Sequence, residues 1–184
     1  MTYYTTSHDL LTATEEQIMA TITFKETPVN TCGTLPNTGD ALPEFSLVAG
    51  DLSEANNATY AGKKIILNIV PSLDTGICQA SARRFNEAAS SLGDTVIINI
   101  SMDLPFAQGR FCESEGLENV VNLSAFRSQN FGNDYGVTMV DGPLAGLFSR
   151  AVIVTDADGN VVYTEQVPEI VQEPDYENAL RAVK

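Results

Sequence analysis

The segment PSLDTGIC at residues 71–78 places a cysteine, Cys78, in the predicted first turn of a helix. Unpaired N–H groups and the positive end of the helix dipole favour a thiolate there over the neutral thiol, and the thiolate is the nucleophilic form. Thr75, three residues earlier, could place its hydroxyl beside the sulfur, and Pro71 would shield the site from bulk water. These residue types at this spacing would make Cys78 a reactive nucleophile.

Cys78 can also be read as a structural residue. An apolar stripe at helical spacing starts at Cys78 and continues through Ala82, Phe85 and Ala89, and a free cysteine is commonly just a small buried side chain on such a face. The local pattern alone leaves both readings open.

The remaining thiols and the single histidine limit the other kinds of chemistry. Three cysteines, Cys32, Cys78 and Cys112, are too few for a secreted disulfide framework, so a reducing, cytoplasmic location is expected. Cys32 is expected to be incidental. Because His8 is the only histidine, Cys–His catalysis and a zinc site both lack ligands at sensible spacing, and no metal is expected.

Charge and composition exclude several classes of partner. The formal net charge of −14 repels nucleic acid phosphates and anionic headgroups. No apolar run approaches the roughly 20 residues that span a bilayer, so no membrane association is expected. Residues 1–18 show no secretory signal pattern and are expected to form a poorly ordered N-terminal extension to one domain at 19–184.

Two buried strands and two helices are predicted to position the cysteines. Residues 64–70 form a nearly continuous apolar, β-branched run that ends at Pro71, as expected for a central strand. The helix that carries Cys78 starts near Gly76, where Asp74 or Thr75 can cap it. Residues 95–100 predict a second buried strand, and a short helix after Pro105 would carry Cys112.

Shorter elements complete the predicted fold. Alternating residues near 22–29 predict an N-terminal β-hairpin that packs as an edge element, followed by a short strand at 45–48 and a loop from 51 to 62. Strands at 151–154 and 161–163 flank a turn with an Asp-Gly pair, and residues 176–183 predict a closing helix. This order predicts an α/β, thioredoxin-like sandwich with a central mixed sheet flanked by helices.

Pro71, Thr75 and Cys78 match the Pro-x-x-x-Thr-x-x-Cys active-site pattern of the peroxiredoxins, and the fuller PSLDTGICQASARRFN resembles the thiol peroxidase subfamily, which are atypical two-cysteine peroxiredoxins. Four further segments resemble the same subfamily, so the resemblance covers about residues 20 to 184: LPEFSLVAGDLS, DLPFAQGRFCESEGLENVVNLSAFR, YGVTMVDGPLAGLFSRAVIVTDADGNVVY and EPDYENALRAVK.

The resemblance implies a role for five residues. Cys78 would be the peroxidatic cysteine, Thr75 its hydroxyl partner and Pro71 the shield over the pocket. Arg150 would stabilise the thiolate and orient the peroxide through its fork of donors. Cys112 would be the resolving cysteine.

The resemblance also implies a catalytic cycle. The Cys78 thiolate would reduce hydrogen peroxide or an organic hydroperoxide and become a sulfenic acid, which Cys112 would convert to an intramolecular disulfide. Thioredoxin would reduce the disulfide, without a metal or organic cofactor, and the chain would form a homodimer. Because a disulfide needs Cα atoms within roughly 7 Å, local unwinding of one or both helices is expected during turnover.

Two other functions are compatible with the same fold. The sequence Cys78-Gln79-Ala80-Ser81 superficially resembles the Cys-x-x-Ser site of a thiol–disulfide exchange protein, although Thr75 and Pro71 argue against it. A redox sensor that signals through the same disulfide is the non-enzymatic alternative.

Overall fold

The structure is a computed structural model, and it describes residues 19–128 and 130–184. The predicted N-terminal extension, residues 1–18, lies outside the described residues. Within the described part of the chain, no helix is long and apolar enough to cross a membrane.

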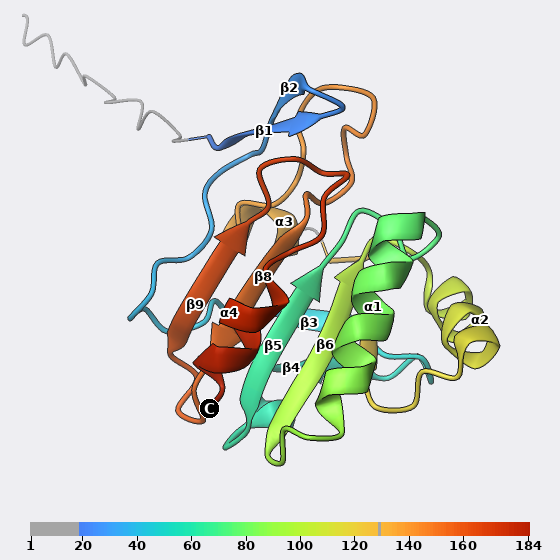
Figure 1. Cartoon of the computed structure of the whole chain (residues 1–184), viewed down its shortest axis with the longest axis vertical. Helices are drawn as coiled ribbons and strands as arrows, with labels where there is room; N and C mark the ends of the chain where they lie inside the picture. The colour runs from blue at the N-terminus through green and yellow to red at the C-terminus, as the bar shows by residue number, and fades with distance from the viewer. Residues whose placement is uncertain (1–18, 129) are drawn as a thin grey trace, which may run out of the picture.

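The core of the fold is a seven-stranded mixed sheet in the order β4-β3-β7-β6-β5-β8-β9 (Figure 1). Three neighbouring strands, β5, β6 and β7, are parallel, and the other pairs are antiparallel. The strands are β3 (Ser46–Val48), β4 (Glu54–Asn56), β5 (Lys64–Ile69), β6 (Thr95–Ser101), β7 (Val121–Ser124), β8 (Ala151–Thr155) and β9 (Val161–Gln166). This architecture confirms the predicted α/β sandwich.

The helices connect the parallel strands and cover the sheet. α1 (Gly76–Ala89) joins β5 to β6, and α2 (Pro105–Glu115) joins β6 to β7, as parallel pairing requires a crossover. α1 and α4 (Tyr176–Ala182) pack on one face, where Phe85 and Ala179 meet Ile66, Ile97 and Val152 of the sheet. The opposite face is covered by the segments around the 3₁₀ helix η1 (Asn57–Tyr60) and α3 (Phe131–Asp134).

The N-terminal hairpin is present, but its predicted place at the edge of the main sheet is wrong. β1 (Thr21–Phe24) and β2 (Thr27–Asn30) form a separate two-stranded sheet at one end of the molecule (Figure 1). β1 is held by the segment after β9, because Thr23 N–H donates to the Pro168 carbonyl and the Thr23 carbonyl accepts from Ile170 N–H. Long-range pairing of this kind leaves no local signal in the sequence.

A single carboxylate secures the hairpin turn. Lys25 and Glu26 both have positive φ, 51° and 66°, which is costly for residues other than glycine. The Glu169 carboxylate accepts hydrogen bonds from both of their backbone N–H groups and from the Thr23 hydroxyl. These bonds, led by that of Glu26 N–H, lower the pKa of Glu169 to about 2. The docked hairpin brings Phe24 toward the end of the sheet where α1 begins.

The structure contains two strands and a 3₁₀ helix that the sequence patterns do not predict. The predicted loop from 51 to 62 contains β4 and η1, and β7 was not predicted. These strands have only three and four residues, which is too short for a period-two pattern to be recognised in the sequence. Pairing with β3 and β6 stabilises them.

Candidate active site

Cys78 lies in the first turn of α1, just beyond the carboxyl end of β5, and its side chain is completely buried. Thr75 is the N-cap residue, but its hydroxyl makes no capping hydrogen bond. Instead Thr75 Oγ1 lies 2.8 Å from Cys78 Sγ and 3.0 Å from the Ser72 carbonyl oxygen. The predicted contact between Thr75 and the cysteine sulfur is therefore present.

Arg150 reaches the same sulfur from the start of β8. β8 pairs antiparallel with β5, with Ala151 opposite Ile69, so its first residues lie beside the end of β5 that leads to α1. Arg150 Nη2 donates to Cys78 Sγ over 3.4 Å, and Nε and Nη2 both donate to the Ile170 carbonyl at 3.1 Å. The guanidinium is buried, and its Nη1 has no hydrogen-bond partner among the described residues.

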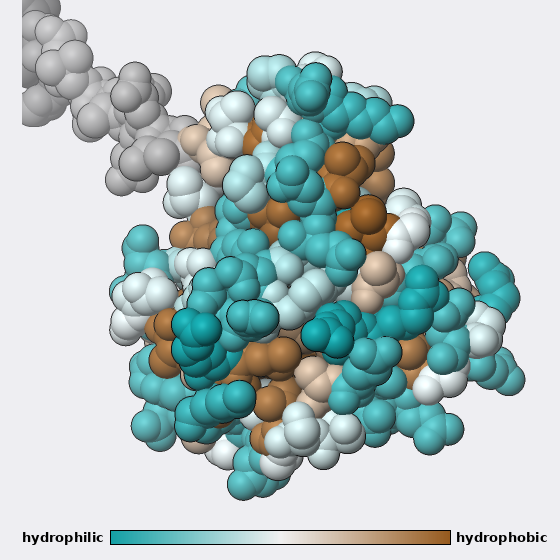
Figure 2. Space-filling model, viewed as in Figure 1, coloured by the Kyte–Doolittle hydropathy of each residue, from teal (hydrophilic) through white to brown (hydrophobic). Residues whose placement is uncertain are grey.

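A mainly apolar cavity of about 340 Å³ opens beside these groups. Figure 2 shows hydrophobic residues at the surface just below the β1–β2 hairpin, and a second hydrophobic area lower on the same face. The cavity is lined by Phe24, Pro71, Thr75, Gly76, Ile77, Leu144, Leu147, Arg150, Ile170 and Val171. Its walls can accept an apolar group, whereas its only charged donor is Arg150.

Cys112 lies in the last turn of α2, close to Gly116, which ends the helix in the left-handed conformation at φ 64°. Asn122 Nδ2 donates to Cys112 Sγ over 2.8 Å. Partial burial raises the pKa of the Cys112 thiol, and the Asn122 hydrogen bond opposes that rise. The environments of the two thiols therefore differ, because Cys78 is at the positive end of one helix and Cys112 at the negative end of another.

The two cysteines border one apolar cluster but are not bonded to each other. Cys78 packs with Val70, Leu73 and Ala82, and Cys112 packs against the same cluster from α2. All three cysteines in the described residues are free thiols. Cys32 lies elsewhere, where its buried sulfur donates to the Gly132 carbonyl.

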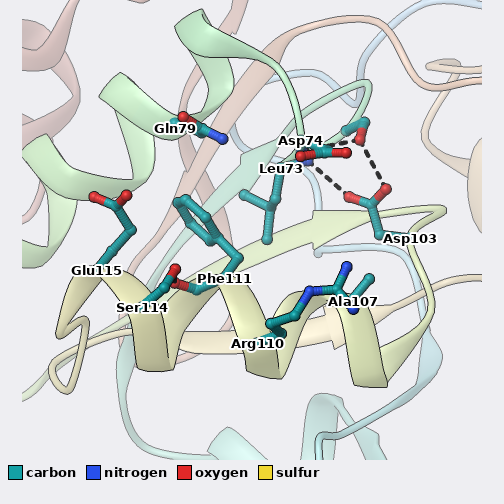
Figure 3. Close-up of a pocket in the computed structure, with 10 residues that line it drawn as sticks. Leu73, Asp74, Gln79, Asp103, Ala107, Arg110, Phe111, Ser114 and Glu115 are labelled. Carbon is teal, nitrogen blue, oxygen red and sulfur yellow. Dashed lines mark hydrogen bonds between the residues drawn. The ribbon is translucent and has the colours of Figure 1, made fainter.

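A groove of about 270 Å³ separates the start of α1 from α2 (Figure 3). Asp103 borders it and accepts hydrogen bonds from the Ser72 hydroxyl and from Leu73 N–H, which holds the loop that leads into α1. Phe111, next to Cys112, points from α2 toward α1 in Figure 3. The groove therefore lies between the two helices that carry Cys78 and Cys112.

Across residues 19–128 and 130–184, no three His, Cys, Asp or Glu side chains gather where they could hold a metal ion.

Comparison with known proteins identifies the class. The redoxin family model matches residues 37–180. Thiol peroxidases of Mycobacterium bovis and Mycobacterium tuberculosis are 54% identical over 165 residues, which cover 90% of this chain and 99% of theirs. A peroxiredoxin-like protein from Aquifex aeolicus superposes with a TM-score of 0.84 at 38% identity, covering 90% of this chain and 97% of that one. A thiol peroxidase from Chromobacterium violaceum superposes with a TM-score of 0.82 at 25% identity, covering 88% of this chain and 93% of that one.

The chain therefore belongs to the redoxin family, and its fold and its similarity to these thiol peroxidases make it a peroxiredoxin enzyme. Within that class it is of the thiol peroxidase type. The resemblance seen in the sequence is thereby confirmed, whereas the roles of individual site residues remain predictions.

Several residues at the site were not singled out from the sequence. Phe24 and the Ile170 carbonyl come from elements that are distant along the chain. Asn68 of β5 and Asn99 of β6 are buried beneath the site, where Asn68 Nδ2 donates to Asn99 Oδ1 and to Ser81 of α1. These two residues did leave a signal, because each is a carboxamide that interrupts an apolar, β-branched strand at a similar position.

Proposed function

We propose that this enzyme reduces hydrogen peroxide and organic hydroperoxides through a Cys78 sulfenic acid, with Cys112 as the resolving thiol and thioredoxin as the reductant. The observation that carries the proposal is the convergence of the Thr75 hydroxyl and the Arg150 guanidinium on the Cys78 sulfur beside an open cavity.

The first step is attack of the Cys78 thiolate on the terminal oxygen of the hydroperoxide. The S–O bond forms as the O–O bond breaks, and the departing RO⁻ takes a proton to leave as ROH. Arg150 would favour the thiolate, and its guanidinium would stabilise the charge that moves onto the leaving oxygen. The Thr75 hydroxyl would hold the attacked oxygen near the sulfur.

In the second step the Cys112 sulfur attacks Cys78 Sγ, and the hydroxyl of the sulfenic acid leaves as water. Contact of both thiols with one apolar cluster supports an intramolecular disulfide. Helix turns must loosen for the sulfurs to meet, and the groove between α1 and α2 is where that approach would occur. Thioredoxin would then reduce the disulfide through a mixed disulfide.

The apolar cavity walls support alkyl hydroperoxides as substrates alongside hydrogen peroxide. Following the family expectation, the enzyme would work as a cytoplasmic homodimer.

A peroxidase assay coupled to thioredoxin, thioredoxin reductase and NADPH tests the proposal with hydrogen peroxide and cumene hydroperoxide. Wild type should consume both peroxides, Cys78→Ser should be inactive, and Cys32→Ser is the matched control with one cysteine removed elsewhere. Substantial turnover by Cys78→Ser would refute Cys78 as the attacking thiol. Failure of thioredoxin to sustain turnover by wild type would refute thioredoxin as the reductant.

A further inference from the structure

Three asparagines form a hydrogen-bonded row across the parallel strands of the sheet. Asn68 of β5 pairs in register with Asn99 of β6, and Asn99 pairs with Asn122 of β7. Asn68 Nδ2 donates to Asn99 Oδ1 over 2.8 Å, and Asn99 Nδ2 donates to Asn122 Oδ1 over 3.0 Å. Asn122 Nδ2 then donates to Cys112 Sγ over 2.8 Å. The row therefore ends on the sulfur of Cys112.

The other end of the row reaches the helix that carries Cys78. Asn68 Nδ2 also donates to Ser81 Oγ over 3.0 Å, and the Ser81 hydroxyl lies 3.3 Å from the Cys78 carbonyl oxygen. One continuous set of side chains therefore connects the backbone of Cys78 with the sulfur of Cys112.

The row is unusual for its place in the fold. Asn68 and Asn99 are completely buried in central parallel strands, where Val, Ile and Leu are the usual residues. A buried carboxamide is costly unless it is hydrogen-bonded, and here each amide is satisfied mainly by the next. Because all three donate in the same direction, their dipoles add toward Cys112.

Cys112 needs such a donor if it is to react as a thiolate. Partial burial disfavours its charged form, and so does its place in the last turn of α2, where its carbonyl accepts from Gly116 and Leu117 N–H groups. The charged groups of the surrounding elements are Arg110, Glu113 and Glu115 of α2, Arg83, Arg84 and Glu87 of α1, and Glu118 of the following loop. Among the described residues, Asn122 is the only hydrogen-bond partner of the sulfur, and Arg83 pairs with Glu115 instead.

We propose that Asn122, held in orientation by Asn99 and Asn68, is a positioning residue for the resolving step and stabilises the Cys112 thiolate as it attacks Cys78. The inference rests on the proposed function, because it assigns Asn122 a part in the reaction of Cys112 with the sulfenic acid. In that step the S–S bond forms and the S–O bond of the sulfenic acid breaks. The proton lost by Cys112 and the departing hydroxide leave together as water.

The first experiment measures Cys112 alone. In a Cys32→Ser, Cys78→Ser background, the pH dependence of Cys112 alkylation is compared between Asn122, Asn122→Leu and Asn122→Asp. The three side chains have nearly the same shape, so differences between them reflect the donor and the charge. The proposal predicts that the pKa of Cys112 rises by about one unit in Asn122→Leu, which loses the donor. The pKa of Cys112 should rise further in Asn122→Asp, which replaces the donor with a negative charge. A packing role alone would not produce this order.

The second experiment measures resolution in chains with all cysteines present. After one equivalent of hydrogen peroxide, sulfenic acid formation and disulfide formation are followed by rapid quenching and mass spectrometry. Asn122→Leu should form the sulfenic acid at the wild-type rate but form the disulfide about tenfold more slowly, since one hydrogen bond to a charged group is lost. Asn37→Leu, which removes an exposed carboxamide far along the chain, serves as the matched control and should match wild type.

The outcomes separate the inference from the proposed function. Unchanged alkylation profiles and an unchanged rate of disulfide formation in folded Asn122 variants would overturn the role of Asn122. Absence of any Cys78–Cys112 disulfide in wild type would instead refute Cys112 as the resolving thiol, and the alkylation titration would still report on Asn122. Thermal unfolding shows whether each variant is folded. If either Asn122→Leu or Asn122→Asp fails to fold, the alkylation profile of the other variant tests the role of Asn122.

Discussion

Arg150 donates to the sulfur of Cys78 over 3.4 Å although 72 residues separate them in the sequence. The antiparallel pairing of β8 with β5 makes this contact possible, because it places the start of one strand beside the end of the other. The same guanidinium is tied to the Ile170 carbonyl by two hydrogen bonds, which fix its orientation toward the sulfur.

The fork geometry of Arg150 can be separated from its charge. Arg150→Lys keeps a cation but cannot bond both the Ile170 carbonyl and the sulfur with a fixed fork, so it should react more slowly with peroxide than wild type. Arg150→Met removes the charge as well as the fork and should react more slowly still. The stopped-flow rate of reaction with peroxide compares the three proteins. A wild-type rate for Arg150→Met would mean that Arg150 has no catalytic part.

Arg150→Met should also lower stability. The substitution leaves the buried Ile170 carbonyl without the two donors that it has now, at a cost of about 1–3 kcal/mol. Urea unfolding compares the variant with wild type. An unchanged midpoint would mean that water or another donor replaces the guanidinium at that carbonyl.

Thr75→Val tests the hydroxyl beside Cys78. The shape is nearly conserved while the donor 2.8 Å from the sulfur is lost, so the second-order rate with peroxide should fall by roughly 10- to 100-fold. The hydroxyl makes no capping hydrogen bond to α1, so the far-ultraviolet circular dichroism spectrum should be unchanged. An unaltered rate in the folded variant would remove Thr75 from the mechanism.

Cys112→Ser should leave the first step intact and block the second. The variant would react once with peroxide, and continued exposure would carry Cys78 to the sulfinic acid because no thiol intercepts the sulfenic acid. Mass spectrometry of the treated variant measures this product. A Cys32–Cys78 disulfide as the main product of wild type would show that the resolving thiol had been misassigned.

The apolar wall of the cavity should control the choice of substrate. Val171 lines the cavity and is 41% exposed, so Val171→Glu should fold while placing a carboxylate where an alkyl group would bind. The KM for cumene hydroperoxide should rise several-fold more than that for hydrogen peroxide. Equal changes for both substrates would show that organic hydroperoxides do not use this wall.

Glu169 should make stability depend on pH in acid. Its pKa is lowered in the folded state from 4.5 to about 2, so its contribution is fully present above pH 4.5 and is lost as the pH falls toward 2. In Glu169→Gln the contribution is absent, so the urea midpoint should fall less steeply between pH 5 and 2 than in wild type. The exposed Glu118→Gln is the control, and identical slopes for wild type and Glu169→Gln would contradict the role of this carboxylate in holding the hairpin.

Local sequence determined the elements that carry the cysteines. The apolar runs that became β5 and β6 end at turn residues, and Gly76 and Pro105 begin helices at their predicted places. These features follow from side-chain periodicity and from the backbone preferences of proline and glycine, which act over a few residues. The placement of Cys78 in a helix first turn could be predicted for that reason.

The tertiary structure alone decided how distant residues meet. The hairpin docks through Glu169, and β7 is a strand because it pairs with β6 on one side and β3 on the other. The row from Asn68 through Asn99 to Asn122 depends on the register of three strands, and a shift of one residue would turn an asparagine to the other face. Strand register and the approach of Arg150 to Cys78 are set by long-range packing, to which no short stretch of sequence is sensitive.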